Sequence, residues 1–446
     1  MSREITIKKM DNQNLFSQSY SEIVRNVIGD GNQYFQMLGE AVSFNWPVAP
    51  IGQLSREAYQ FMSAAPAYSP IGIFGGVGAS TFFKNYRQIF AHVGFNESPE
   101  AQKQLRDLSN QATELQNEIT ITWTNANTAY NTAKQNGGAV FTAKYPDITA
   151  WLAGPGDVYA KEADGLQKAA NSVFDQMEAL NEAQMPTTLK EALDITKMPT
   201  SKPADGNSPR GWTVVQNGAG NLEWQPVFNI ATTSRQWRQQ LTDGTIGEKT
   251  IVLKADKSDS SIEKTWAGGN VGYGNPFWGV YANGGWQRTD ISKSDKSVTA
   301  TINLKSATVV NITPGEWYDG GFLKQIAING NKGQGYSILS PYTTTGGSHP
   351  LFGKDGLCST MVTGLVVAYK PSFSIRMKSS TYKMYEEKIE AGGGFRIGPF
   401  SFGGHGGSYK QEIETTGNDT IVTGGSTSDD PVIIGVTVGF PGVEKP

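Results

Sequence analysis

The spacing of hydrophobic residues changes near residue 200, and the change divides the chain into two kinds of structure. Between residues 98 and 136, apolar side chains recur every three or four positions, as on one face of a helix. This stripe consists of Leu105, Leu108, Ala112, Leu115, Ile119, Trp123, Ala126, Tyr130 and Ala133. Its average step of about 3.5 residues is typical of a seam between packed helices. The pattern predicts a long helix over residues 98–136.

Local signals bound this helix and predict a partner for it. Ser98-Pro99-Glu100 supplies an N-cap, a proline at the first helical position and an acid in the first turn. Gly137-Gly138 ends the helix, which would be roughly 55–60 Å long. A second stripe, over residues 157–184, consists of Val158, Leu166, Ala169, Ala170, Val173, Met177 and Leu180. We expect the two helices to pack antiparallel as an elongated hairpin.

The region before this hairpin also has helical spacing. Apolar residues over 14–54 fall at Ile23, Val27, Tyr34, Phe35 and Leu38. Pro47 and Pro50 would interrupt a helix here. We therefore expect short helices between residues 14 and 54.

Beyond residue 211, apolar and polar residues alternate over short segments separated by Asn-Gly, Gly-Gly and proline-containing turns, which is typical of strands. The segments are residues 250–254, 297–304, 308–312, 363–369, 373–377 and 432–438. One short helix is expected over residues 234–241. The pattern predicts an α+β protein whose elongated helical hairpin or bundle precedes a β-rich, sandwich- or barrel-like domain.

The domain boundaries follow from these patterns. Residues 1–185 are expected to form the helical domain, with its long helices at about 98–136 and 157–184. Residues 186–211 contain Pro186, Pro199, Pro203 and Pro209 among small polar residues, and they predict a linker. Residues 212–446 are expected to form the glycine-rich β domain, with one or two subdomains.

Composition removes several classes of function. The chain has 446 residues, is 38% hydrophobic and carries a net charge of −3, so it can form packed cores but has no basic surface for nucleic acid. Cys358 is the single cysteine, which excludes an intramolecular disulfide and a multi-cysteine zinc site. We expect Cys358 to be a buried apolar side chain in a strand.

No catalytic motif emerges from the sequence. The three histidines are His92, His349 and His405, and no two have the spacing of a metal-binding pair. The glycines around Gly76 and Gly78 lack the lysine of a phosphate loop and the third glycine of a dinucleotide loop. We predict no enzymatic activity, no catalytic residue, no metal and no cofactor.

Residues 58–83 contain no charged side chain. The segment is long enough to cross a hydrocarbon layer, but its glycine, serine and proline content argues against a permanent transmembrane helix. It is the candidate membrane-interacting segment, through Ile71, Ile73, Phe74, Val77, Phe82 and Phe83.

Two further apolar clusters are candidates for contact with a partner. The first could stack on sugar rings or fill a β core, and it consists of Trp266, Tyr273, Trp278, Tyr281 and Trp286. The second lies in a glycine-rich, almost uncharged segment that could enter a lipid interface or fold back over the sheet. It consists of Phe395, Ile397, Phe400 and Phe402.

Three functions fit these features. The first is a membrane-active, pore-forming or toxin-like protein whose helical part meets a lipid membrane and whose β-rich part recognises a cell-surface receptor. We expect a homo-oligomer or a second component in that case. A self-assembling particle, tail or filament protein and a glycan-binding module are the alternatives. The N-terminal residues lack the apolar core of a Sec signal, so we expect synthesis in the cytoplasm, with later release left open.

Overall fold

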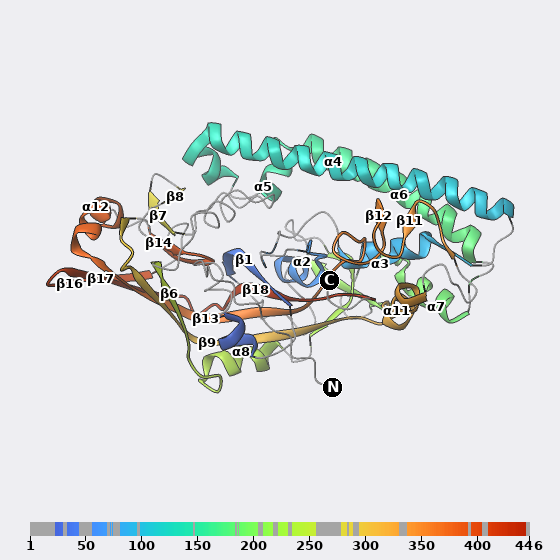
Figure 1. Cartoon of the computed structure of the whole chain (residues 1–446). Helices are drawn as coiled ribbons and strands as arrows, with labels where there is room; N and C mark the ends of the chain where they lie inside the picture. The colour runs from blue at the N-terminus through green and yellow to red at the C-terminus, as the bar shows by residue number, and fades with distance from the viewer. Residues whose placement is uncertain are drawn as a thin grey trace.

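The computed structural model describes most of the chain. The described residues are 23–29, 34–43, 56–68, 72, 74, 81–95, 99–145, 148–182, 185, 187–203, 208–216, 222–230, 234–255, 278–282, 285–288, 294–329, 337–390, 394–403 and 409–442. They form an α+β protein that combines a long helix with a large antiparallel sheet (Figure 1).

The two long helices expected from the hydrophobic spacing are present. They are α4 (Pro99–Lys144) and α6 (Asp157–Glu182), which lie side by side and are joined through the short helix α5 (Ile148–Leu152) (Figure 1). On α4 the side chains of Leu105, Ala112, Ile119 and Ala126 are buried at seven-residue intervals. The matching buried residues of α6 are Ala163, Ala170, Val173 and Met177. This seam holds the hairpin together because each helix covers the apolar stripe of the other.

The helical geometry of α4 breaks at Gly138, where the prediction ended the first helix. Gly138 has φ 53° and ψ −139°, a conformation that glycine adopts readily because it has no Cβ. The chain then makes one more helical segment up to Lys144 before it reverses toward α6. The end of the hairpin is therefore a folded turn rather than a simple loop.

The main sheet is built around the long strand β13 (Met361–Lys378). Strand β9 (Thr299–Pro314) pairs along one side of it, and β18 (Val432–Gly439) and β17 (Asp419–Ser426) pair with its first and second halves along the other. The outer strands are β1 (Tyr34–Ser43), β5 (Phe228–Ile230), β6 (Lys249–Lys254) and β16 (Tyr409–Thr416). Every pairing in this sheet is antiparallel.

The alternation of residues in β9 explains how the sheet acquires a core face. Ala300, Ile302 and Leu304 are buried, whereas Asn303 between them is exposed. Because successive side chains of a strand point to opposite faces, this period of two places one apolar row against the core.

The expectation of short helices over residues 14–54 was wrong for β1. Its residues Tyr34–Met37 pair with Val438–Gly435 of β18, and Tyr34, Phe35, Met37 and Leu38 are all buried. A short apolar run buried on both faces satisfies helical spacing and strand formation equally well, and here the exposed edge of β18 decides the outcome. The only described helical residues nearby belong to η1 (Val24–Ile28) and its flank.

Two insertions meet beside the main sheet. One lies between β6 and β9 and contains β7 (Trp278–Ala282) and β8 (Gly285–Arg288). The other lies between β13 and β17 and contains α12 (Ser379–Glu390), β14 (Gly394–Ile397) and β15 (Phe400–Gly403). Pairing of β7 with β14 joins them into a four-stranded sheet. At their common root, Asp295 accepts hydrogen bonds from Lys378 N and Thr381 Oγ1, so one carboxylate ties the start of α12 to the segment before β9.

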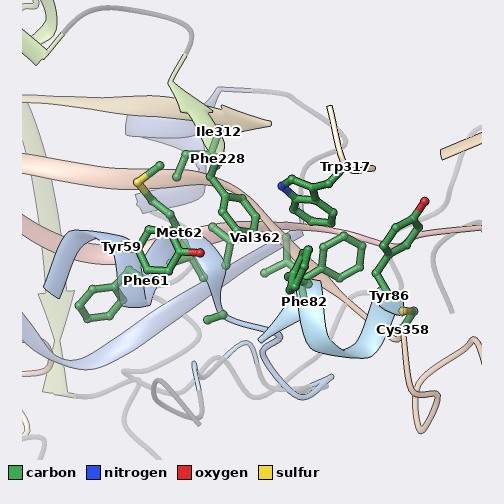
Figure 2. Close-up of a cluster of buried hydrophobic side chains, with 14 of the residues drawn as sticks. Tyr59, Phe61, Met62, Phe82, Tyr86, Phe228, Ile312, Trp317, Cys358 and Val362 are labelled. Carbon is green, nitrogen blue, oxygen red and sulfur yellow. The ribbon is translucent and has the colours of Figure 1, made fainter. Parts of the chain in front are cut away.

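The remaining elements enclose the largest hydrophobic core. These are α2 (Arg56–Ser63), β2 (Val93–Gly94), α3 (Phe82–Ala91), α7 (Thr187–Thr196), β3 (Trp212–Gln216), β4 (Leu222–Pro226), α8 (Ser234–Thr242), α11 (Gly320–Asn329), β10 (Ser337–Ile338), β11 (Tyr342–Thr343) and β12 (His349–Pro350). Side chains from α2 and α3 pack there with side chains from β5, β9 and β13 (Figure 2). Described residues between Tyr34 and Phe95 thus share a core with the C-terminal half of the chain.

The proline-rich stretch expected as a linker, residues 186–211, contains the helix α7. The indole nitrogen of Trp212 donates a hydrogen bond to the carbonyl of Ile195, and that of Trp224 donates to the carbonyl of Ser201. Leu193 is buried in the largest core. The described part of this stretch is therefore held against the body of the protein.

Candidate functional site

The uncharged segment lies in the largest core as far as the structure describes it. Phe74 and Phe82 are fully buried and Phe83 is almost so. The ring centroid of Phe83 lies 5.0 Å from that of Trp317 and 5.5 Å from that of Trp212. Figure 2 shows Phe82 beside Trp317. Ile71, Ile73 and Val77 lie outside the described residues. Contact with lipid would therefore require Phe74, Phe82 and Phe83 to leave the core.

The aromatic cluster of residues 266–286 is described through its backbone. Trp278 and Tyr281 lie in β7 and Trp286 lies in β8, and Tyr281 pairs with Trp286. Trp266 and Tyr273 fall outside the described residues, as do the side chains of the other three. The structure therefore places three of the five positions on the paired strands β7 and β8.

The glycine-rich apolar segment folds back over the main sheet. Phe395, Ile397, Phe400 and Phe402 occupy the hairpin β14–β15 and are buried in a second core. The ring centroid of Phe402 lies 4.4 Å from that of Phe373 in β13. Arg396, also buried, donates hydrogen bonds to the carbonyl of Gly39 in β1 and to Ser401 Oγ. In this conformation the four apolar side chains are core residues.

Groups with chemical reactivity are few and enclosed. Cys358 is completely buried, and burial raises the pKa of its thiol well above the ordinary range, so it is a poor nucleophile here. Among the described residues, no three His, Cys, Asp or Glu side chains gather in a way that could hold a metal ion. None of the described helices is both long and apolar enough to cross a membrane.

The structure does bring together two histidines that are far apart in the sequence. The ring of His92, at the end of α3, stacks on Tyr342 with centroids 3.7 Å apart, and His349 lies on the other strand of the same small sheet, 5.6 Å from Tyr342. His92 Nδ1 lies 3.1 Å from Ser109 Oγ of α4. Burial, with a smaller contribution from the charge of His349, lowers the pKa of His92 to about 3.

This histidine stack forms part of the base of the helical hairpin, which we define as the end where α4 begins and α6 ends. On α6, Asn181 Nδ2 donates hydrogen bonds to the carbonyls of Phe90 and Val93. Glu178 forms ion pairs with Arg87 of α3, at 3.4 Å, and with Lys197, at 2.9 Å. The base is therefore fastened to α3, to α7 and to the loop around β11.

The opposite end, here called the tip, is built differently. Its buried centre consists of Ala126, Tyr130 and Trp151. The partly exposed residues packed around them are Trp123, Ala129, Phe141, Tyr145, Ile148, Leu152 and Tyr159. All of them belong to the hairpin itself. The tip is thus a small aromatic core to which no described residue of the body contributes.

Ring contacts and glycines shape the tip. The ring centroids of Tyr130 and Trp151, and those of Trp151 and Tyr159, are each 5.9 Å apart. A Cβ on Gly156 would lie 2.3 Å from the Trp151 indole, so glycine is needed for the indole to pack there. The turn between the helices places the aromatic rings of three segments against one another.

The surface of the tip carries apolar and basic groups. The side chains of Val140 and Val158 are 82% and 59% exposed. Lys134 Nζ lies 6.0 Å from the ring centroid of Tyr130, and Lys144 Nζ lies 5.4 Å from that of Tyr145. The sequence pattern predicts no site here, since residues 137–156 fall outside both predicted long helices. The signal that could have identified it is its aromatic content, with Phe141, Tyr145 and Trp151 between the two predicted helices and Tyr159 at the start of the second.

Comparison of the chain with known protein families, with curated proteins and with solved structures finds no match. The function must therefore be inferred from the geometry of the chain itself.

Proposed function

We propose that the protein is a non-enzymatic, membrane-active protein of the pore-forming or toxin-like kind, and that the tip of its helical hairpin makes the first contact with lipid. The observation that carries the proposal is the combination found at the tip. Exposed Val140 and Val158, partly exposed aromatic rings and lysine amines gather at an end whose hydrophobic cluster, among the described residues, contains side chains of the hairpin only.

These residue types suit the interface between water and lipid. Tyrosine and tryptophan rings prefer the headgroup level of a bilayer, and lysines extend their amines toward the phosphates while their stems remain in apolar surroundings. Removal of a valine side chain from water contributes about 1.5–3 kcal/mol when burial is complete. Burial of the two exposed valines, together with the aromatic side chains around them, would therefore contribute several kcal/mol to membrane binding.

The other parts of the molecule would act later or elsewhere. Phe82 and Phe83 would meet lipid only after they separate from Trp317, so their contact with lipid belongs to a step that follows docking. The β-rich part would supply recognition of a cell-surface receptor. In this scheme the tip attaches the protein and a conformational change comes afterwards.

Vesicle flotation tests the proposal. The wild type and the double variant Val140→Asp/Val158→Asp are mixed with phosphatidylcholine vesicles and with vesicles that also contain phosphatidylserine. We expect the wild type to float, with preference for the anionic vesicles, and the variant to bind at least tenfold more weakly. Release of an entrapped dye, measured in parallel, distinguishes pore formation from simple attachment.

A control variant tests whether vesicle binding depends on the tip or on any exposed apolar side chain. Ile328 in α11 is 68% exposed and lies far from the tip in sequence. Ile328→Asp should float like the wild type. Equal binding by all three proteins would remove the tip from the mechanism, and a wild type that floats with neither type of vesicle would overturn the membrane function.

A self-assembling structural protein is the second candidate. Among the described strands, β16 and β6 each pair on one side only, and such unpaired edges favour contact between chains. A large particle that forms without lipid and never floats would favour this function over the first.

A further inference from the structure

We propose that the sheet continues from one molecule to the next, with β16 of one copy paired to β6 of a second copy in a head-to-tail arrangement. This contact needs neither lipid nor the tip, so it goes beyond the membrane function and can be tested separately.

Strand β16 is the open end of the sheet on one side. It pairs with β17 from Tyr409↔Ser426 to Thr416↔Asp419, and no other described strand pairs with it. Residues 412–416 are all exposed, and Ile413 is one of the exposed large apolar side chains. The outer edge of β16 can therefore accept another strand without displacing a described one.

Strand β6 is the open end on the opposite side. It pairs with β9 alone among the described strands. Ile251 and Leu253 face the core, whereas Val252 is exposed. A hydrogen bond from Asn26 Nδ2 to the carbonyl of Thr250 lies beside this strand. Because η1 crosses here, the incoming strand would pair most readily with the part of β6 that follows Thr250.

The cross-strand rows of the sheet show which side chains would meet. One row runs Lys254–Thr299–Arg376–Ile421–Glu414, from β6 through β9, β13 and β17 to β16. The two ends of this row therefore share a face of the sheet and carry opposite charges. In a second copy placed without a shift in register, Lys254 would lie beside Glu414 of the first.

The neighbouring row fits in the same way. It runs Leu253–Ala300–Ile375–Val422–Ile413 and lies on the core face. The exposed Ile413 would thus extend the apolar row of the next copy. A shift of two residues keeps every side chain on its face and brings Glu412 toward Lys254 instead, so the charges fit in either register.

Charge also selects between partners. Pairing of β16 with a second β16 would place Glu412 and Glu414 near their own copies, and like charges on facing strands are destabilising. Pairing with β6 brings Lys254, which lies on the same face of the sheet, near these glutamates and replaces that repulsion with attraction. Since β6 and β16 both run parallel to β13, the new ladder would be parallel. Such a contact uses different surfaces on the two copies, so it builds rings or filaments rather than closed dimers.

Charge reversal on the full chain tests this contact. Glu412→Lys/Glu414→Lys makes positions 412, 414 and 254 all basic, and Lys254→Glu makes all three positions acidic. Light scattering after size exclusion, over a range of protein concentrations at low salt, measures assembly. We expect the wild type to associate and each variant alone to associate at least tenfold more weakly. An equimolar mixture of the two variants should assemble again, because each basic edge then meets an acidic one.

Disulfide trapping gives a second readout that does not depend on affinity. The double variant Glu414→Cys/Lys254→Cys should form a ladder of cross-linked species on mild oxidation, whereas each single variant should not, since Cys358 is buried. Cross-linked dimers of Glu414→Cys alone would indicate β16–β16 pairing and overturn the proposal. A wild type that stays monomeric at every concentration, or a variant mixture that fails to assemble, would overturn it as well. Val140→Asp/Val158→Asp should assemble normally, which separates this result from failure of the membrane function.

Discussion

The base and the tip of the helical hairpin are made from the same two helices, yet they are held in different ways. At the base, polar side chains reach into other elements, as Asn181 does with the carbonyls of Phe90 and Val93. At the tip, the rings of Tyr130 and Trp151 lie in a hydrophobic cluster whose described members all come from the hairpin. This difference indicates that a long helical hairpin can be attached to the body of the protein at one end while the core of its other end forms within the hairpin. An independent end is suited to contact with a partner, because changes there need not disturb the body.

The largest effect is expected when one core residue from each end of the hairpin is replaced by alanine. Trp151→Ala removes the centre of the tip, and loss of a buried tryptophan side chain costs about 3–5 kcal/mol. We expect amide hydrogen exchange over residues 139–159 to accelerate by about 100-fold or more, while exchange in β13 stays unchanged. Hydrogen exchange with mass spectrometry measures both segments in one experiment.

Met177→Ala is the matched variant at the base. Met177 is fully buried in the cluster that includes Ala91 and Leu339 of the body. We expect a loss of about 2–5 kcal/mol in the free energy of global unfolding in urea, because the cavity opens between the hairpin and the body. If Trp151→Ala lowered global stability as much as Met177→Ala does, the tip would not be an independent unit.

Acidification should weaken the base and leave the tip unaffected. His92 is enclosed by Ser109 of α4, Phe174 of α6 and Tyr342, with His349 beyond Tyr342. Its pKa in the folded protein, about 3, lies below the ordinary value of about 6.5, so the unfolded state takes up the proton first as the pH falls. The stability present above pH 6.5 is therefore lost progressively below it, by about 2 kcal/mol at pH 5.

Urea unfolding at pH 7 and pH 5 measures this effect. His92→Phe keeps an aromatic ring against Tyr342 but cannot take up a proton, so its stability should change less between the two pH values than that of the wild type. If the unfolding free energies of both proteins changed equally between pH 7 and pH 5, His92 would be excluded as the titrating group. The comparison stops at pH 5 because carboxylates begin to titrate below it.

The smallest effect is expected when an ion pair at the base and an ion pair at the tip are each removed. Glu178 at the base is largely shielded and contacts both Arg87 and Lys197, and Glu178→Gln should cost about 1–2 kcal/mol in urea unfolding because charge-assisted hydrogen bonds are lost. At the tip, the exposed side chain of Lys161 pairs with the exposed side chain of Asp157. Lys161→Ala should leave the unfolding midpoint unchanged within error, because exposed ion pairs contribute little. If both variants lost a similar amount of unfolding free energy, the ion pairs at the base and at the tip would not differ in their contribution to stability.

Sequence patterns predicted the hairpin well because its stabilising information is local. The stripe from Leu105 to Ala126 and the break at Gly138 can be read from neighbouring residues. Strand β1 could not be identified in this way, since its conformation depends on β18, a segment almost 400 residues later. The same reason explains why residues 391–403 were open to two interpretations. Whether Phe395 and Phe402 face water or a core depends on Phe373, which the local sequence does not reveal.

The candidate sites were harder to predict than the fold. The apolar character of residues 58–83 suggested a membrane segment, but the same character suits a core residue such as Phe82. The tip was overlooked because turns are expected to be polar, and its rings come from three short segments. His92 contacts Tyr342, next to His349, only because two chain segments about 250 residues apart meet in the fold, and no sequence motif predicts that contact.

The pairing of β1 with β18 has a consequence for synthesis. A ribosome that adds about 5–20 residues per second needs roughly 20–80 s to proceed from the end of β1 to the start of β18. During this interval the buried residues Phe35 and Met37 have no strand to pair with, and they are exposed to chaperones and to neighbouring nascent chains. The hairpin α4–α6, whose contacts are local, can form long before the sheet is closed. Expression at a reduced rate of translation, or together with a chaperone that binds apolar strands, should therefore affect the yield of native protein more than any change at the tip.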